Sequence, residues 1–514
     1  MSQDDLRIRL LVKSVVKPAF SETEVNLNDE NWHLAEYTYN SSTKRSDLPS
    51  FACISYRWFG GREPNPFYQD KYMSTLTLPS LATAMRNSTT LAFWIDAFCV
   101  PPQKPLKTRT LENMGLIYHL ATEVLVVLSG CRFDTMMLMS GTDSLSSHLL
   151  RTIENAVYDL NADEWVKSIW TYQESVNSRQ YYFIRGRNID VGENSRDIVI
   201  QGAKFFNRVG EIISIYKTAK KINSYDVCRM LPNLNALEDL MVDWQLSGFL
   251  KRSALQVISN LDRRLCQSPM DYFYSLIGSI TDEIVSRRPS QTIIEVCETF
   301  IKICEKKRDF SFIYTATQRN NKPGRRRWYP LAGPLRSVLP WHSGGEKQRG
   351  EWDERGLWLE SMVLIDPSPT LGSVGKTFIT QWHQAVHLQL PSQFDGDSDF
   401  AIAIRSFAVL QAMGFTGSIM YILTPSGIFF PQEPVQRVSE LIVATDVSWV
   451  FGAPGLVKTY VRDEVQYTTG VFVGQTASAE ASPVLLEGTK WTEWDADEYS
   501  DEEWAERNED AKDE

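Results

Sequence analysis

The sequence predicts an α/β protein with a parallel-sheet domain, a helical extension and a β-rich C-terminal domain. Three observations lead to this prediction. Short apolar runs alternate with helical spacing between about residues 50 and 190, and such alternation builds βαβ units, which need a parallel sheet. Residues 200–310 keep apolar side chains at helical spacing. From about Trp328, short strand-like runs separated by Gly and Pro favour an antiparallel sheet.

The clearest βαβ unit begins at Leu91. Leu91–Ile95 is a short apolar run typical of a buried strand, and it stops at Asp96. Prolines at positions 101, 102 and 105 then exclude a helix and favour an extended turn. Apolar residues recur at helical spacing from Thr110 to Ala121, and Val124–Leu128 follows as a second buried strand ending at Ser129. Ligands collect at the carboxyl ends of such strands, where Asp96 and Ser129 would lie.

Further elements are predicted around this unit. Their sequence signals are β-branched runs, helical apolar spacing and Gly breaks. In chain order they are an opening strand over Ile8–Val16, a mostly polar linker to Ser50, a strand over Cys53–Ser55, a helix over Leu78–Met85, a helix over Asp163–Glu174 capped by Asp163, and a strand over Tyr181–Ile184.

Composition excludes several classes of protein. The 514 residues carry a net charge of -11, and residues 493–514 alone hold 12 acidic and 2 basic residues, so the rest of the chain is nearly neutral. A nearly neutral body lacks the basic face of a nucleic-acid binder. Seven cysteines without a CxxC pair indicate a reducing compartment. The chain shows neither a signal-peptide start nor an apolar run of about 18 residues. We therefore expect a cytoplasmic protein that contacts neither nucleic acid nor membrane.

Changes in the sequence pattern along the chain predict four domains or segments. Their boundaries fall where helical spacing gives way to breakers, as in the basic loop Asn320–Arg327. They are residues 1–195, a parallel-sheet domain that includes the N-terminal strand; 196–325, a helical region; 326–486, a β-rich domain; and 487–514, an acidic tail too charged to fold alone.

Four motifs in this order resemble the fungal heterokaryon-incompatibility (HET) domain. They are Ile54-Ser-Tyr-Arg-Trp-Phe-Gly60, Trp94-Ile-Asp-Ala-Phe-Cys-Val-Pro-Pro-Gln103, Met114-Gly-Leu-Ile-Tyr-His-Leu-Ala121 and Trp165…Trp170-Thr-Tyr-Gln-Glu174. Asp271–Gly278 is similar to a segment that commonly follows the domain. The chain departs from the family pattern where Phe59 is inserted before the glycine and where Ser168 replaces a frequent Arg.

The HET resemblance implies a fold and a chemistry. HET domains are similar to Toll/interleukin-receptor (TIR) domains, which are flavodoxin-like, and many TIR domains cleave NAD. Ser168-x-Trp170-x-x-x-Glu174 matches a TIR helix pattern, which makes Glu174 the implied catalytic residue and NAD the implied substrate, with no metal and no other cofactor. The residues implied to line the nucleotide pocket are Ser55, Tyr56, Arg57, Trp58, Asp96, Ser168 and Trp170.

Two functions remain open at this point. The first is a fungal effector of allorecognition or innate immunity that triggers programmed cell death by binding or hydrolysing NAD, in response to an unknown protein trigger. The second is a non-catalytic signalling module of the same fold that forms a homo-oligomer. Convergence of Ser55, Arg57, Asp96 and Glu174 on one open pocket would favour the enzyme. Each side chain also has an ordinary structural explanation, such as a solvated Glu174 or an Asp96 that caps its turn.

Overall fold

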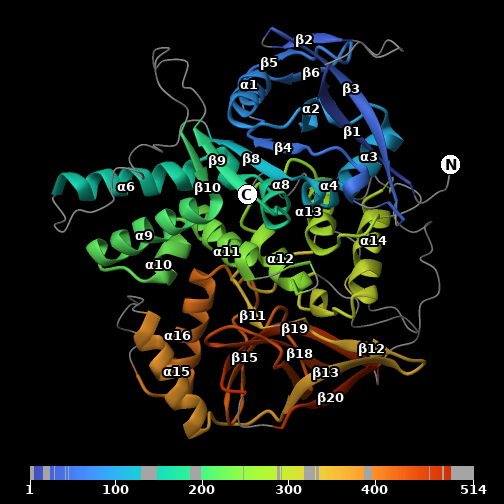
Figure 1. The fold of residues 1–514 in the computed structure, drawn as a ribbon. Coiled ribbons are helices and arrows are strands. Elements are labelled where there is room, and N and C mark those ends of the chain that lie inside the picture. The colour runs from blue at the N-terminus through green and yellow to red at the C-terminus, as the bar shows by residue number, and fades with distance from the viewer. Residues whose placement is uncertain are drawn as a thin grey trace.

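The computed structural model of the protein describes residues 5–14, 24–27, 29–40, 42–43, 45–58, 60–128, 147–185, 198–246, 248–249, 251–285, 290, 292–317, 330, 335–345, 347–386, 396–461, 464–476 and 480–487. An N-terminal sheet with its helices lies at the top of Figure 1, a block of helices in the middle, and a second sheet flanked by two helices at the bottom. One hydrophobic core cluster draws residues from all three parts, so they pack as one body.

The N-terminal sheet has a parallel centre with antiparallel additions. Its strand order is β10-β9-β8-β4-β7-β1-β3-β2, and the bounds are β1 Leu6–Lys13, β2 Val25–Leu27, β3 Glu30–Tyr39, β4 Ala52–Tyr56, β7 Ala92–Trp94, β8 Glu123–Leu128, β9 Tyr181–Arg185 and β10 Val199–Gln201. Strand β4 pairs in parallel with both β7 and β8, and β8 pairs in parallel with β9. The predicted parallel neighbours are confirmed. Counted from β4, the parallel order is 2-1-3-4, as in flavodoxin-like sheets.

The prediction of a mostly polar linker up to Ser50 is wrong in part. Strand β3 pairs with the full length of β1, from Leu6 opposite Tyr39 to Lys13 opposite Trp32. Among the buried hydrophobic residues of the core, β3 contributes only Trp32 and Leu34. A strand with so few buried apolar side chains gives a weak alternation signal. A small hairpin, β5 Arg62–Pro64 with β6 Tyr72–Ser74, also follows β4.

The helices on this sheet differ from prediction at two places. Their bounds are α1 Thr77–Asn87, α2 Asp96–Cys99, α3 Lys104–Glu112, α4 Met114–Leu120, α6 Ser147–Ala162, α7 Glu164–Lys167 and α8 Trp170–Val176. Helix α3 begins before the predicted Thr110, because Pro105 lies in its first turn, where a proline loses no helical hydrogen bond. Asp163 caps α7 as expected, accepting a hydrogen bond from the Trp165 backbone at 2.8 Å.

The predicted helix over Asp163–Glu174 is interrupted at Ser168. The backbone there is paired with a distant residue, since the Leu265 N–H donates to the Lys167 carbonyl at 2.7 Å. The Ile169 N–H in turn donates to the Leu265 carbonyl at 3.1 Å. These tertiary hydrogen bonds replace helical ones, and they reorient α8 relative to α7.

The helical extension packs under the first sheet. Its helices are α9 Gly202–Lys220, α10 Ser224–Met230, α11 Pro232–Leu246, α12 Ala254–Leu261, α13 Pro269–Ile280 and α14 Ile293–Lys306, which confirms mainly helical structure here. Helix α13 crosses α4 at backbone distance: a Cβ on Gly115 would lie 1.9 Å from the Gly278 carbonyl oxygen. Both glycines are needed for this close crossing.

The C-terminal sheet is antiparallel, as predicted. Its order is β12-β13-β16-β18-β19-β15-β14, with β20 beside β13, and the elements are β11 Gly344–Gly345, β12 Gly350–Trp352, β13 Gly356–Ile365, β14 Ile422–Leu423, β15 Gly427–Pro431, β16 Val438–Ala444, β17 Val447–Ser448, β18 Gly452–Val461, β19 Glu464–Gly474 and β20 Ser482–Glu487. Two helices that we did not predict, α15 Ser373–Val386 and α16 Asp399–Ala412, lie beside it (Figure 1). Residues 488–514 of the acidic tail lie outside the described residues.

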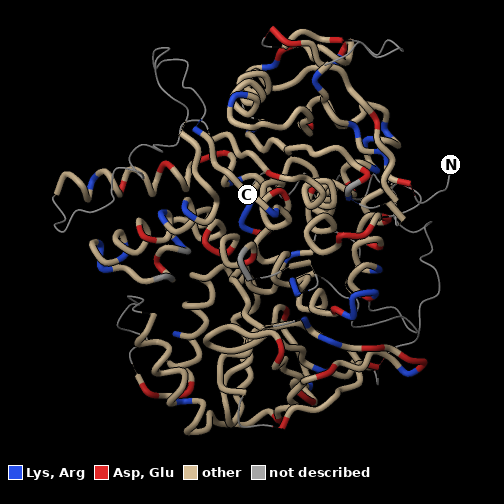
Figure 2. The backbone as a smooth tube through the Cα atoms, viewed as in Figure 1, with Lys and Arg blue, Asp and Glu red and all other residues tan. Residues whose placement is uncertain are grey.

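Charge is dispersed along the described backbone. Figure 2 shows basic and acidic positions interspersed over both sheets and the helices between them. Within the described ranges, none of the helices has both the length and the apolar character to cross a membrane.

Candidate functional site

The predicted site residues on the strands lie at one edge of the N-terminal sheet. Ser55 is the penultimate residue of β4, and Asp96 begins α2 directly after β7. Because β4 and β7 run parallel, their carboxyl ends meet at the same edge. Strand β4 also pairs with β8, so this edge is the switch point at which open α/β sheets bind ligands.

Glu174 points into this edge from α8. The Ser55 hydroxyl donates a hydrogen bond to Glu174 Oε2, and Trp165 Nε1 donates to Ser55 Oγ at 2.7 Å. The Tyr118 side chain also lowers the pKa of the Glu174 carboxyl group. Glu174 is only 8% exposed. The carboxyl group is therefore enclosed by polar side chains from β4, α4 and the helices before β9.

Asp96 lies beside Glu174 and nearer the solvent. Trp58 Nε1 donates to Asp96 Oδ2 at 2.5 Å, and the Ala97 N–H donates to Oδ1 at 2.7 Å. Tyr56 lowers the pKa of the same carboxyl group, while its hydroxyl lies 3.0 Å from Thr77 Oγ1. The Trp58 ring is 53% exposed and covers the Asp96 side of the site. The alternative in which Asp96 caps its own turn is present too, through the Ala97 contact.

Burial perturbs both carboxyl groups. Burial raises the pKa of Glu174 to about 8; the hydrogen bond from Ser55 opposes the rise, the Asp96 carboxylate adds to it and Tyr118 opposes it. Burial also raises the pKa of Asp96 to about 6, against hydrogen bonds from Trp58 and the Ala97 N–H and a smaller lowering by Tyr56. At neutral pH, Glu174 is thus mostly protonated and Asp96 mostly ionised. Two neighbouring carboxyl groups with separated pKa values are typical of acid–base sites.

Arg57 acts on Asp163 at the start of α7. Its charge lowers the pKa of Asp163, the cap of α7, against the larger effect of burial. Among the described residues, the buried Arg57 Nε has no hydrogen-bond partner. Among the described residues, the contacts of Asp96 do not include an ion pair with Arg57.

Ser168 and Trp170 are not brought into this cluster. The Ser168 carbonyl accepts hydrogen bonds from Thr171 Oγ1 at 2.8 Å and from Arg264 at 3.3 Å. The Trp170 ring stacks on Tyr274 of α13, with 6.5 Å between ring centroids. The interruption before α8 directs both residues toward the helical extension while Glu174 faces the sheet.

Comparison with known proteins identifies one family for the N-terminal sheet. Residues 51–174 match the family model described as heterokaryon incompatibility protein (HET). The chain carries a HET domain. No curated protein and no solved structure matches the chain. This match begins just before β4 and ends at Glu174. It supports a heterokaryon-incompatibility-type role in general.

The HET domain is fastened to helices outside the family match. Arg252 is 1% exposed and donates to the Val176 carbonyl at 2.8 Å and to Asn177 Oδ1 at 2.9 Å, at the end of α8. Arg264 donates to the Val166 carbonyl at 2.8 Å, before the start of α8. Two buried guanidinium groups from the helical extension therefore fix both ends of the helix that carries Glu174.

Sequence reasoning missed two members of the HET-domain site. The helical spacing around Tyr118 and Trp165 predicts only packing, yet Trp165 donates to Ser55, Tyr118 lowers the pKa of Glu174, and both are less than 2% exposed. A buried Tyr or Trp needs a partner for its polar atom, and that need was the available signal.

Other chemistry is not favoured in the HET domain. Cys99 is buried, and burial raises the pKa of its thiol to about 12, which suits packing and not a nucleophile. Across the described ranges, His, Cys, Asp and Glu side chains form no group of three or more that could hold a metal ion.

Proposed function

We propose that this protein is a heterokaryon-incompatibility effector whose HET domain hydrolyses NAD and thereby triggers cell death. The observation that carries the proposal is the convergence of Ser55, Asp96 and Glu174 at the switch point of the sheet. Ligands of open α/β sheets bind there. The unpartnered, buried Nε of Arg57 beside this edge offers a donor for a nucleotide phosphate.

Hydrolysis of NAD requires little from the protein beyond a positioned carboxylate. The bond between ribose C1′ and the nicotinamide nitrogen breaks, and its electron pair neutralises the pyridinium ring, which leaves as nicotinamide. Water then adds to the oxocarbenium-like carbon and gives up a proton. A carboxylate beside the ribose stabilises the developing positive charge. Glu174 is the residue placed to do so, with Ser55 orienting it.

Substrate binding would itself activate Glu174. The resting carboxyl group is mostly protonated because burial raises its pKa to about 8. A cationic nicotinamide ring nearby favours the ionised form and lowers that pKa. Access requires the Trp58 ring to leave Asp96, and its 53% exposure allows this without breaking the core.

A non-catalytic signalling module that self-associates through the HET domain is the second candidate. One observation favours it: Glu174 is nearly buried and already accepts a hydrogen bond from Ser55. In that case the carboxyl group holds α8 on the sheet and no substrate reaches it.

Nicotinamide release distinguishes the two candidates. Purified protein is incubated with NAD, and wild type is compared with Glu174→Gln and with Glu112→Gln. Glu112 is a matched control, since it is fully buried on α3, accepts a hydrogen bond from the Ser290 N–H at 2.9 Å and lies outside the site. We expect Glu174→Gln to lower the rate about 10²–10³-fold and Glu112→Gln to leave it unchanged.

Killing in a fungal host completes the test. If Glu174→Gln kills as well as wild type and cellular NAD stays constant in both, the enzyme proposal is wrong. Self-association of the wild type that every variant retains would then support the signalling module.

A further inference from the structure

We infer that His342, Asp243 and Tyr172 form a pH-sensitive bridge, which ties the segment before the C-terminal sheet to helix α8 of the HET domain. His342 belongs to residues 335–345, a segment that ends in β11. Its Nε2 atom lies 3.3 Å from Asp243 Oδ1 on α11. The other oxygen of the same carboxylate accepts a hydrogen bond from the Tyr172 hydroxyl at 2.7 Å. Tyr172 lies on α8, two residues before Glu174.

The His342 bridge lies where the helical extension meets the C-terminal sheet. Asp243 and Tyr172 are fully buried, whereas the side chain of His342 is 26% exposed, so the imidazole can exchange protons with the solvent. The neighbouring Trp341 ring stacks on Tyr225 of α10, with 5.1 Å between ring centroids. Strand β11 then pairs with β17 of the C-terminal part. The segment that carries His342 therefore contacts both parts of the protein.

The charged groups that face His342 come from α11 and from the turn after α12. Burial lowers the pKa of His342, but the hydrogen bond to Asp243 and the charges of Asp239 and Asp243 raise it, and Arg263 opposes them. Their net effect is a pKa above the ordinary value of 6.5. Arg263 itself lies 2.5 Å from Asp239. Gln256 Nε2 also donates to Asp243 Oδ1, so the carboxylate keeps a donor when the imidazole is neutral.

The strength of the His342 bridge depends on the charge of the imidazole. A charged donor holds a carboxylate more strongly than a neutral one. Because the fold raises the pKa of His342, the stability that this group contributes is fully present below the unfolded value of about 6.5. It is lost as the pH rises through the folded pKa. The bridge is therefore strong in mild acid and weak in mild alkali.

A second titrating group holds the same segment. Asp262 accepts hydrogen bonds from the Ser337 N–H at 2.5 Å and from the Tyr272 hydroxyl at 3.1 Å. Burial raises the pKa of Asp262 to about 7, against these hydrogen bonds and the charges of Arg336 and Arg263. A carboxyl group with a raised pKa also contributes stability that is lost as the pH rises. Both groups therefore loosen the segment in the same direction.

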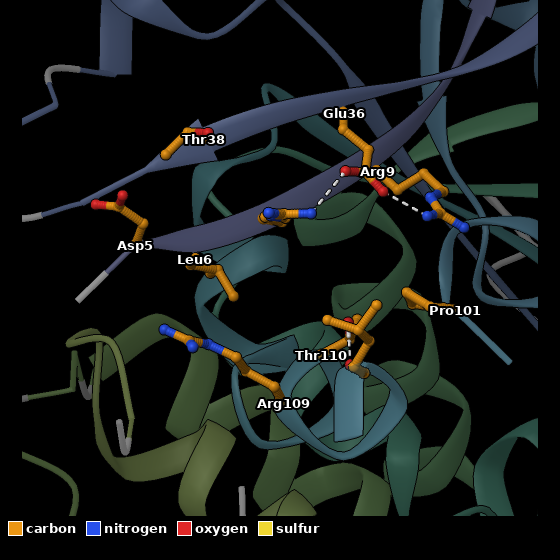
Figure 3. Close-up of a pocket in the computed structure, with 10 residues that line it drawn as sticks. Asp5, Leu6, Arg9, Glu36, Thr38, Pro101, Arg109 and Thr110 are labelled. Atoms are coloured by element: carbon orange, nitrogen blue, oxygen red, sulfur yellow. Dashed lines mark hydrogen bonds and ion pairs between the residues drawn. The ribbon is translucent and has the colours of Figure 1, made fainter. Parts of the chain in front are cut away.

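The ion pairs around the cavity in Figure 3 differ from this bridge. That cavity, of about 240 Å³, lies between strands β1 and β3 and helix α3. Arg9 pairs with Glu36 and donates to the Tyr68 hydroxyl at 2.7 Å, and Glu36 Oε2 also lies 3.5 Å from Arg7 Nη1. Guanidinium groups stay charged throughout the physiological range. Arg7 and Arg9 therefore keep their charge near neutral pH, whereas His342 does not.

Titration of the histidines by NMR tests the charge of the His342 bridge. Isotope labelling of the imidazole Cε1 atoms reports on the six histidines of the chain, and His342→Gln identifies the signal of His342. We expect a midpoint above 6.5 in the wild type and a midpoint about one pH unit or more lower in Asp243→Asn. Asp309→Asn is the matched control, because Asp309 is also buried but accepts its hydrogen bonds from the backbone of Ala254 and Ser311. A wild-type midpoint at or below 6.5, or an equal midpoint in Asp243→Asn, would overturn the inference.

Hydrogen exchange of Trp170–Val176 tests the connection to α8. Wild type and His342→Gln are compared at equal pH, so that intrinsic exchange rates cancel. At about pH 6 the amides of α8 should exchange about threefold faster or more in His342→Gln, and at about pH 9 the two proteins should exchange alike. His383→Gln is the control, because burial and the charge of Arg405 lower the pKa of His383 to about 4 and this imidazole is neutral at both pH values.

Two outcomes of the exchange measurement would overturn the inference. Equal exchange of α8 in wild type and His342→Gln at about pH 6 would show that the bridge does not reach α8. A difference that persists unchanged at about pH 9 would show that His342 acts through packing and not through its charge. None of these measurements uses NAD, so their result is separate from that of the proposed hydrolysis.

Discussion

Replacing Glu174 by Gln should change how stability depends on pH. Burial raises the pKa of Glu174 from 4.5 to about 8, so the folded state holds a proton that the unfolded chain releases. A carboxyl group with a raised pKa contributes stability that is fully present below about pH 4.5. That contribution is lost as the pH rises, and the loss is complete only above the folded pKa of about 8.

The size of this loss follows from the same pKa values. One pKa unit corresponds to about 1.36 kcal/mol, so the wild-type chain should lose about 3 kcal/mol from this one group between about pH 5 and pH 8. Gln keeps the shape and the hydrogen bonds but has no proton to lose. All other titrating groups are shared by the two proteins and cancel in the comparison.

Thermal unfolding at several pH values measures this difference. Because the unfolding entropy is about 2.1 cal/mol/K per residue, a change of 1 kcal/mol shifts the melting temperature of a body of this size by about 1–2 °C. We therefore expect the melting temperature of Glu174→Gln minus that of wild type to increase by about 3–6 °C from about pH 5 to pH 8. Parallel curves for the two proteins would refute the reasoning, since they would mean that Glu174 titrates like a solvated carboxyl group.

Three further predictions concern the fold. Arg252→Ala should lower the melting temperature by several degrees, because the Val176 carbonyl at the end of α8 would lose its donor. For the same reason residues 1–195 expressed alone, which lack Arg252, should be insoluble, and a soluble, folded 1–195 fragment would contradict this. Gly278→Ala should destabilise the protein by about 1–3 kcal/mol, because the added methyl group meets Gln173 Oε1 at 1.8 Å; unchanged denaturant unfolding would show that α13 can shift freely. Deleting residues 490–514 should change the melting temperature by less than about 4 °C, and a larger fall would show that the acidic tail docks.

The parallel centre of the sheet could be predicted because its strands are short, apolar and separated by helical spacing. Strand β3 could not, since it buries only Trp32 and Leu34 among its core positions and owes its place to pairing with β1. In the C-terminal part, Ile379, Trp382 and Val386 do recur at helical spacing, and the frequent Gly and Pro around them led to a strand-only prediction. Residue propensity and hydrophobic pattern describe local preference. The structure of such segments is decided by the partners with which they pair in the folded chain.

The site was predictable in its strand members and less so in its helical ones. Ser55 and Asp96 follow from the rule that parallel strands bring their carboxyl ends to one edge. The pattern Ser168-x-Trp170-x-x-x-Glu174 suggested three neighbours on one helix, but the backbone pairing at Leu265 ends that helix at Ser168, and Trp170 stacks on Tyr274 while Glu174 bonds Ser55. A contact to a residue about 100 positions away leaves no trace in the local pattern.

The pH dependence of nicotinamide release tests the central proposal most directly. For the free enzyme, kcat/KM follows the ionisation of the catalytic carboxylate. With a pKa of about 8 for Glu174, the ionised fraction, and with it kcat/KM, should rise about 50-fold between about pH 6 and pH 8. Glu174→Gln should show neither the rate nor the rise. Absence of release at every pH, or a Glu174→Gln variant that matches wild type across the range, would contradict a catalytic Glu174.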